Sequence, residues 1–381
     1  MNRHGWTYKK LGDVAVIAGG STPKTNNPSF WGGSHYWVTP AELGDFVYIN
    51  KTERTITDEA LTKTNLTLLP IGTVLLSSRA PIGKTAITTV PMYCNQGFKN
   101  IICSKVLNNK FVYYYINRIV PKLQSLGRGA TFKEISKSIV ENTQVPVPPM
   151  AEQESIVAEL DEINEAIAEM QQQITDLDML AQSTFYDMFG DPITNPKGWE
   201  VKKLGDVGEI IAGSTPSTSD EANWYGDVNW VTPAELEEQL YYGETVRKIS
   251  AKAATRLTLM PVGTVLLSSR APIGKLAITT VPMCCNQGFK NIVCEEYLNN
   301  IYLYFYLKLT MAKIIALGRG ATFKEVSKKD ISNYEIVLPP LFLQQEFAAK
   351  VEAIETAKAE LNAQIAEMQT LLASRMDYYF D

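Results

Sequence analysis

Residues 66–103 read LTLLPIGTVLLSSRAPIGKTAITTVPMYCNQGFKNIIC, and residues 257–294 repeat this stretch with 33 of 38 positions identical. Two shorter stretches recur in the same order: WVTPAEL at 37–43 and 230–236, and LGRGATFKE at 126–134 and 317–325. The repeating unit is therefore about 191 residues long, half of the chain. Solenoid and propeller repeats are only about 20–50 residues long, so the repeat indicates a duplicated module with pseudo-twofold symmetry. We expect two similar binding sites, one on each module.

Composition places the chain among ordinary globular proteins. Its 381 residues are 45% apolar, enough for a full core and for two or three domains. The five cysteines form no CxxC pair and there are only two histidines, which argues against a disulfide framework and a zinc site. Reduced thiols indicate a cytoplasmic protein. The N-terminus has no apolar leader, and no stretch approaches the ~18 apolar residues of a membrane helix, so we expect neither secretion nor membrane insertion.

The net charge of -5 conceals an uneven distribution. Residues 1–149 carry 17 basic and 8 acidic side chains, whereas residues 150–191 carry 11 acidic side chains and no basic one. Residues 192–340 are nearly neutral at +1, and residues 341–381 carry -4. The local distribution of charge, more than the bulk isoelectric point, determines whether a surface attracts nucleic acid. The acidic segments are either solvated helix surfaces or docking surfaces.

Each acidic segment follows a proline-rich stop and has the pattern of a long helix. Apolar residues alternate spacings of four and three, the seam of a coiled coil, over roughly 35 residues in each segment. The seams comprise Ile156, Leu160, Ile163, Ile167, Met170, Ile174, Leu177 and Ala181, and Phe347, Val351, Ile354, Leu361, Ile365, Met368 and Leu372, with Lys358 among the latter. We expect the two helices to pair in an antiparallel coiled coil; the alternative is that each packs on its own module.

The modules themselves are predicted to be α+β. Short β-branched runs bounded by Gly, Pro or Asn indicate strands at 73–76, 86–90, 100–103 and 145–147. One helix is expected in each module, at 109–126 and 300–317, where aromatic and aliphatic residues are concentrated.

Several catalytic motifs nearly occur but fail on one required residue. SRAPIGKT at 78–85 resembles a phosphate-binding loop, but Ser78 replaces its first glycine. Asn27-Pro28-Ser29-Phe30 approaches the tetrad of an adenine methyltransferase but lacks the second proline. His4 and His35 have no counterparts in the second module, so no hydrolytic triad is credible. We therefore expect no catalytic residues, no metal and no cofactor in this chain.

Polar loop clusters that recur in both modules are the candidate DNA-binding residues. Arg and Lys can bridge guanine O6 and N7, Asn and Gln can pair with adenine, and Ser, Lys or glycine-loop amides can hold phosphates. Ordinary loops also contain these residue types, and the tryptophans at 31, 37, 224 and 230 have the pattern of core residues. The candidates in the first module are Ser77, Ser78, Arg79, Lys84, Asn95, Gln96, Lys99, Arg128, Thr131 and Lys133. Their counterparts in the second module are Ser268, Ser269, Arg270, Lys275, Asn286, Gln287, Lys290, Arg319, Thr322 and Lys324.

This layout resembles the specificity (S) subunit of type I restriction-modification systems. The resemblance rests on WGGx4VTPAEL at 31–43, GTVLLSSRAPIG at 72–83, NQGF at 95–98 and GAT at 129–131, leading through Pro148-Pro149 to EQE at 152–154. Each motif is weakly specific alone, but their order, repeated twice, is highly specific and covers the whole chain. The resemblance implies two target-recognition domains, residues 1–149 and 191–340, that alternate with two long helices, residues 150–190 and 341–381.

The resemblance also implies the partners. Each recognition domain would read one half of a split site in double-stranded DNA, and the paired helices would set the spacing. Two methyltransferase (M) subunits would dock near the helices and flip adenines for N6 methylation, and restriction (R) motor-nuclease subunits would join for cleavage. The chain itself would be a non-catalytic subunit.

One departure from the family pattern makes the expectation sharper. Recognition domains of this family usually differ strongly within a chain, whereas these are nearly the same outside residues 44–65 against 237–256, and 104–125 against 295–316. Two similar readers in opposite orientation predict an interrupted, near-palindromic site, with any specificity differences in those segments. The competing hypothesis is a bivalent coiled-coil adaptor that binds protein partners without base-specific DNA recognition.

Overall fold

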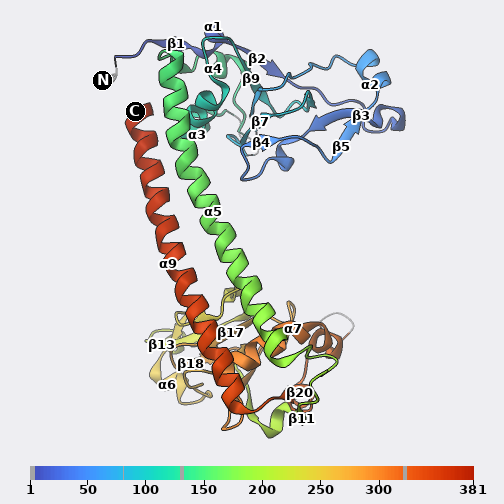
Figure 1. Cartoon of the computed structure of the whole chain (residues 1–381), viewed down its shortest axis with the longest axis vertical. Coiled ribbons are helices and arrows are strands. Elements are labelled where there is room, and N and C mark those ends of the chain that lie inside the picture. Colours follow the sequence, from blue (N-terminus) through green and yellow to red (C-terminus); the bar gives the residue numbers. More distant parts are fainter. Residues whose placement is uncertain (1–4, 80, 129–132, 321–323) are drawn as a thin grey trace. The chain divides into compact units, whose positions relative to one another are not determined.

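The protein divides into two compact units. The structure, a computed structural model, describes residues 5–79, 81–128, 133–320 and 324–381. Unit 1 consists of Met1–Met170 together with Ala363–Asp381, and unit 2 consists of Gln171–Asn362. Each unit therefore combines one copy of the repeat with parts of both long helices (Figure 1).

The recognition module of unit 1 contains two mixed sheets and a small strand pair. A five-stranded sheet has the order β2-β9-β6-β7-β4, a three-stranded sheet has the order β5-β3-β8, and β1 pairs with β10. The elements are β1 (Tyr8–Lys10), α1 (Leu11–Val14), β2 (Ala15–Gly19), η1 (Pro28–Phe30), β3 (Trp31–Val38), η2 (Pro40–Glu42), β4 (Tyr48–Ile49), β5 (Arg54–Ile56), α2 (Asp58–Lys63), β6 (Val74–Leu76), β7 (Thr85–Thr88), β8 (Tyr93–Cys94), β9 (Lys99–Cys103), α3 (Asn109–Leu126), α4 (Lys137–Glu141) and β10 (Gln144–Pro146).

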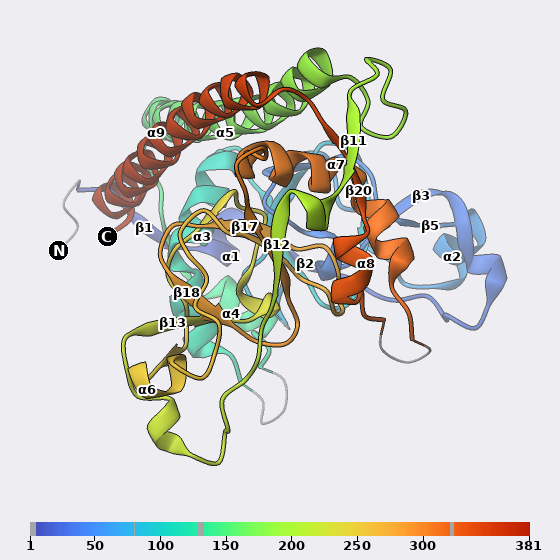
Figure 2. The ribbon, with the colours of Figure 1, turned by 90° about the horizontal axis from the view of Figure 1, so that it is seen from below.

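Unit 2 repeats this topology with sheets β12-β19-β16-β17-β14 and β15-β13-β18 and the strand pair β11-β20, which Figure 2 shows beside α7 and α8. Its elements are β11 (Glu200–Lys203), η3 (Leu204–Asp206), β12 (Gly208–Ala212), η4 (Glu221–Asn223), β13 (Val228–Val231), η5 (Pro233–Glu235), β14 (Tyr241–Tyr242), β15 (Lys248–Ile249), α6 (Ala251–Ala254), β16 (Val265–Leu267), β17 (Leu276–Thr279), β18 (Met283–Cys285), β19 (Lys290–Cys294), α7 (Asn300–Leu317), α8 (Lys328–Ser332) and β20 (Glu335–Leu338). The expected α+β class and the module helices at 109–126 and 300–317 are confirmed.

The central strand of each large sheet is apolar throughout because both of its faces are covered. In β6, Val74 and Leu76 belong to the core beneath α3, whereas Leu75 belongs to a second core on the opposite face. In β16, Val265 and Leu267 share a core with α7, and Leu266 points to the other side. Alternation of side chains along a strand thus explains the repeated apolar run at the start of the conserved stretch.

The two long helices, α5 (Met150–Phe189) and α9 (Leu341–Phe380), run in opposite directions within each unit (Figure 1). In unit 1 the early part of α5 meets the late part of α9, where the Arg375 guanidinium pairs with the Glu159 carboxylate. In unit 2 the late part of α5 meets the early part of α9, where the Phe185 and Phe347 rings lie 5.5 Å apart. The antiparallel pairing is confirmed, and the helices also pack on the modules.

A buried glutamine fastens the start of each long helix to its module. The Gln153 side chain is fully buried, and its amide nitrogen donates to the carbonyls of Val106 and Pro148, both at 2.9 Å. Its amide oxygen accepts the N–H of Asn108, the N-cap of α3, at 2.8 Å. Gln344 makes the equivalent three bonds in unit 2. The glutamine of each helix-start motif is thus a structural clamp.

Candidate nucleic-acid interface

Three loops of each module converge beside the central strand of the large sheet. After β6, Ser78 donates its N–H to the Gly97 carbonyl at 2.8 Å, and its carbonyl accepts the N–H of Ile135 at 3.0 Å. Arg79 and Glu134 pair through a short backbone bridge. Equivalent bonds recur in unit 2. We call these assemblies the loop clusters; they comprise the described residues 77–79, 95–99, 126–128 and 133–134 in unit 1 and 268–270, 286–290, 317–320 and 324–325 in unit 2.

Ten of the predicted contact residues make internal hydrogen bonds that shape these loops. Ser77 Oγ accepts the N–H of Lys84 at 2.8 Å and donates to the Pro81 carbonyl at 2.7 Å. The Lys84 ammonium donates to the Leu43 carbonyl at 2.7 Å. The same pattern holds in both units for Ser77, Ser78, Lys84, Asn95 and Lys99, and for Ser268, Ser269, Lys275, Asn286 and Lys290. A direct contact of these ten with DNA stays a prediction.

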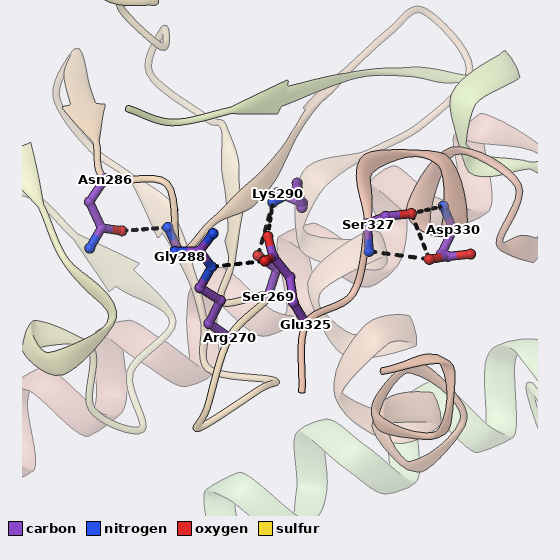
Figure 3. A network of polar contacts seen from close by, with 8 residues as sticks. All are labelled: Ser269, Arg270, Asn286, Gly288, Lys290, Glu325, Ser327 and Asp330. Atoms are coloured by element: carbon purple, nitrogen blue, oxygen red, sulfur yellow. Dashed lines mark hydrogen bonds and ion pairs between the residues drawn. The ribbon is translucent and has the colours of Figure 1, made fainter. Parts of the chain in front are cut away.

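A glutamate absent from the predicted set lies at the centre of each cluster. The Lys290 ammonium lies 3.2 Å from Ser269 Oγ and 3.2 Å from Glu325 Oε1, and Arg270 Nε lies 3.0 Å from Glu325 Oε2 (Figure 3). Partial burial opposes ionisation of Glu325, but hydrogen bonds from Lys290 and Arg270 outweigh it and lower the pKa of the carboxyl group. The signal was present in the sequence, because Glu134 and Glu325 end the repeated LGRGATFKE motif.

The two clusters differ in the placement of one arginine. In unit 1 the Lys99 ammonium lies 3.1 Å from Glu134 Oε1, as in unit 2. Arg79, however, lies beside Gly97, where its Nε is 3.5 Å from the position that a Cβ would take. Among the described residues Arg79 makes no ion pair, whereas Arg270 is bound to Glu325. The same repeated side chain is thus present in two arrangements.

The remaining predicted residues lie on the surface. Arg128, Lys133, Arg319 and Lys324 are exposed, and Arg319 approaches Asp330 at 3.6 Å while its side chain stays 84% exposed. The exposed amides Gln96 and Gln287 accept hydrogen bonds from Thr22 and Thr215. Thr131 and Thr322 lie outside the described residues. The surface candidates are therefore Arg79, Gln96, Arg128 and Lys133 in unit 1, and Arg270, Gln287, Arg319 and Lys324 in unit 2.

A smaller lobe, built on the three-stranded sheet of each module, is held by an arginine stacked on tryptophan. The Arg54 guanidinium lies 3.6 Å from the ring centroid of Trp31, and Arg247 lies 3.8 Å from that of Trp224. The partner tryptophans, Trp37 and Trp230, are buried, in agreement with the core pattern. The first divergent segment, 44–65 against 237–256, contributes β5 and α2, or β15 and α6, to this lobe and the edge strand β4 or β14 to the large sheet. A further divergent stretch was missed, because residues 24–36 and 217–229 share only 3 of 13 positions.

The second divergent segment has a packing role. It contains α3 and α7, whose side chains contact the long helices: the Phe111 ring lies 5.4 Å from Phe380, and the Tyr302 ring lies 5.5 Å from Phe185. Differences between these segments therefore accompany differences between the ends of α5 and α9. A role of this segment in base specificity stays a prediction.

The cysteine thiols, which are potentially reactive groups, are in unreactive states. All five cysteines are free, and burial raises the pKa of Cys94 to about 12 and that of Cys284 to about 11. Within the described ranges, no group of three or more His, Cys, Asp or Glu side chains could hold a metal ion. No described helix is long and apolar enough to cross a bilayer.

The duplicated module matches a known protein family. The model of the type I restriction modification DNA specificity domain matches residues 3–178 and again residues 196–368. The chain belongs to this family. Each specificity-domain match covers one copy of the repeat and most of the helix that follows it, so the family unit is one module plus one helix.

Two similar relatives are specificity subunits of type I restriction enzymes. The type I restriction enzyme MjaIX specificity subunit of Methanocaldococcus jannaschii is 28% identical over 373 residues, covering 92% of this chain and 86% of the relative. The HindI specificity subunit of Haemophilus influenzae is 28% identical over 190 residues, 48% of this chain and 41% of the relative.

Solved structures have the same fold. A chain from a study of complex assembly and conformational transition of the type I R-M system superposes with a TM-score of 0.63 at 22% identity, covering all of this chain and 98% of that one. The type I restriction-modification S subunit from M. genitalium gives a TM-score of 0.55 at 14% identity, again covering all of this chain and 97% of the other. The specificity-domain fold therefore extends over both units.

Proposed function

We propose that this chain is the DNA-recognition subunit of a type I restriction-modification complex. It binds double-stranded DNA at a bipartite site and binds two methyltransferase subunits. It also assembles with the restriction subunits, which cleave DNA. The observation that carries the proposal is the pair of loop clusters, which present the same arginine, glutamine and lysine side chains in both units. These side chains include donors that bind phosphates and the edges of bases.

The proposed site is an interrupted near-palindrome. The surface candidates of the two loop clusters are identical in sequence: half-buried Arg79 and exposed Gln96, Arg128 and Lys133 correspond to Arg270, Gln287, Arg319 and Lys324. Identical readers require near-identical half-sites, and the antiparallel helices favour opposite orientation of the halves. Differences between the half-sites are expected from the smaller lobes, whose sequences diverge.

The chain acts without chemistry of its own in this proposal. The stretches that resemble catalytic motifs each lack a required residue, and the cysteine thiols are held protonated by burial. Methyl transfer and cleavage then belong to the partner subunits. We also propose a cytoplasmic location, where free thiols persist and the DNA substrate is found.

The decisive experiment is co-expression of the chain with its methyltransferase subunit in a host that lacks adenine methylation, followed by single-molecule mapping of N6-methyladenine. We expect one bipartite motif with two near-identical halves. A motif with unrelated halves would contradict the palindrome but keep the function. A stable complex that adds no motif and binds DNA without salt dependence would instead favour the adaptor hypothesis.

A further inference from the structure

The Glu325 carboxylate is fixed from several directions. Its backbone exchanges two hydrogen bonds with Arg319, both at 3.0 Å, and the next residue, Val326, donates its N–H to the Ser269 carbonyl at 2.9 Å. One carboxylate oxygen accepts from the Lys290 ammonium, whose side chain is only 8% exposed. A carboxylate pinned by its own backbone and by a buried cation keeps one orientation.

Arg270 uses one nitrogen on this carboxylate and leaves the others available. Its Nε lies 3.0 Å from Glu325 Oε2, and its side chain is 46% exposed. Within the described part of the chain, neither terminal nitrogen of Arg270 has a hydrogen-bond partner. Figure 3 shows the guanidinium between the Glu325 carboxylate and the Gly288 backbone. The planar guanidinium is therefore oriented through Nε, while both Nη groups have no partner among the described residues and can donate to DNA.

Guanine is the base that this arrangement fits. Two parallel donors from one guanidinium match guanine O6 and N7 in the major groove, the most frequent base-specific contact in protein–DNA complexes. A guanidinium can also bind a phosphate bidentately, but that contact carries no sequence information, so the two are separated by whether one base position or all positions respond. Building on the proposed function, we infer that Arg270 reads one guanine of the half-site bound by unit 2 and that Glu325 is the positioning residue that holds its plane.

Unit 1 provides a natural comparison. It has the same lysine, serine and glutamate, but the Arg79 side chain lies beside Gly97, and among the described residues its guanidinium makes no ion pair with the Glu134 carboxylate. The arginine of unit 1 therefore has to turn onto its glutamate when it meets DNA. Both halves should contain the same guanine, and the effect of removing the carboxylate should be measurable separately in each half.

The test uses the full chain in complex with its methyltransferase subunit and duplexes in which each base of one half-site is replaced in turn. The variants are Arg270→Lys, which keeps the charge but loses the paired donors, and Glu325→Gln, which loses the charged brace. Glu296→Gln is the matched control, because Glu296 is an exposed carboxylate of the same unit outside the loop cluster. Arg79→Lys tests the other half-site.

We expect Arg270→Lys to reduce the preference for guanine about tenfold or more at a single position, with the remaining positions and the salt slope unchanged. Glu325→Gln should weaken the same preference about 3- to 10-fold, and Glu296→Gln should have no effect. Unfolding midpoints show whether Glu325→Gln is folded; if it is not, the exposed Arg270→Lys still decides the matter.

Three results would overturn the inference. Equal weakening by Arg270→Lys at every base, with no single position preferred, would make Arg270 a phosphate contact. A Glu325→Gln effect at a cytosine, with no effect of Arg270→Lys, would make the glutamate itself the reader. Unchanged binding for both variants would remove them from the interface. Failure of the unmodified complex to bind any DNA is a different outcome, because it contradicts the proposed function.

Discussion

Lys99 and Lys290 direct their ammonium groups inward, toward a serine hydroxyl and a glutamate. Only 14% and 8% of these side chains are exposed, and each ammonium has two oxygen partners at 3.1–3.2 Å. A buried ammonium needs such partners, because an unpaired charge away from water is costly. Their charge is thus used to shape the loop cluster and to hold a carboxylate beside an arginine.

Replacing Lys290 should therefore affect stability more than base selection. Lys290→Met leaves Ser269 Oγ without this donor and Glu325 with only Arg270, and we expect a loss of about 1–3 kcal/mol in the free energy of unfolding, measured by urea titration. Lys324→Met, at an exposed position of the same loop cluster, is the control and should change stability little. Full stability together with loss of DNA binding would show that Lys290 contacts DNA.

Glu325 should give the protein a defined acid response. Its folded pKa lies below the ordinary value of 4.5, because the hydrogen bonds from Lys290 and Arg270 outweigh the opposing effect of burial. A lowered pKa stabilises the fold above the ordinary value, and this contribution is lost as the pH falls through the lowered value. The melting-temperature difference between the protein and Glu325→Gln should be constant above pH ~5 and shrink below pH ~4. A difference that grows on acidification would reverse the assigned sign.

Sequence alone found the loop clusters but not the role of each side chain within them. The repeat singled out Ser77, Lys84 and Asn95 as candidates. Serine, lysine and asparagine side chains bind DNA in some loops and backbone groups of the protein in others, and only the structure distinguishes these two roles. Glu134 and Glu325 were not among the predicted contact residues, although they end the repeated motif. The role of Glu325 becomes visible only when the structure places it between Lys290 and Arg270.

Gln153 and Gln344 join the long helices to the modules, so their removal should loosen that junction. Each is fully buried and makes three hydrogen bonds to backbone groups. We expect Gln344→Ala to cost about 1–3 kcal/mol of unfolding free energy, because buried backbone groups would be left unsatisfied. Gln345 is the exposed neighbour, and Gln345→Ala should be nearly neutral in the same denaturation experiment. Equal effects of the two variants would show that the hydrogen bonds of Gln344 do not stabilise the junction.

The helix pair of unit 1 is tied by an ion pair at Glu159, whereas at the equivalent positions of unit 2 the Lys350 ammonium donates to Met188 Sδ at 3.7 Å. Glu159 accepts from Arg375 and Tyr379, and the hydrogen bond from Arg375 contributes most to the lowered pKa of that carboxyl. The equivalent positions of unit 2 carry Lys350, Thr184 and Met188.

Exchanging the charges of Glu159 and Arg375 should reveal how much their contact stabilises the protein. Glu159→Arg and Arg375→Glu should each destabilise the protein, and the double variant should recover part of the loss, with a coupling of about 0.5–1 kcal/mol. Simple addition of the two single effects in thermal unfolding would mean that the contact contributes nothing.

The long helices were readable from their spacing because a seam repeated over many turns is a strong signal. The ends of the helices were predicted less well, because each helix spans 40 residues and the seam predicted roughly 35. What spacing could not reveal is that the apolar residues also enter the module cores. Phe347 and Val351 fit a coiled-coil seam and a module core equally well, and they belong to both.

The C-terminal end of a long helix completes the hydrophobic core of each unit. Phe380, at the end of α9, packs against Phe111 and Tyr115 in unit 1, with ring centroids 5.4 and 5.6 Å away. Phe189, at the end of α5, packs against Tyr302 and Phe347 in unit 2, at 4.9 and 5.5 Å. The two phenylalanines occupy equivalent positions of the repeat.

Truncating these rings should destabilise the units separately. Phe380→Ala should cost about 3–5 kcal/mol and lower hydrogen-exchange protection in unit 1 alone, while Phe189→Ala should do so in unit 2 alone. Equal loss of protection in both units after either substitution would show that the molecule unfolds as one cooperative body. The same variants should weaken recognition of one half-site each.

The division of the chain also orders events on the ribosome. Unit 2 is one continuous stretch, Gln171–Asn362, whereas unit 1 needs Ala363–Asp381 in addition to the first 170 residues. The segment synthesised first must therefore wait, with its aromatic core uncovered, until the last turns of α9 leave the exit tunnel. Domains usually fold in the order in which they are translated; here the second unit has all its residues first, so we expect the N-terminal half to complete its core last.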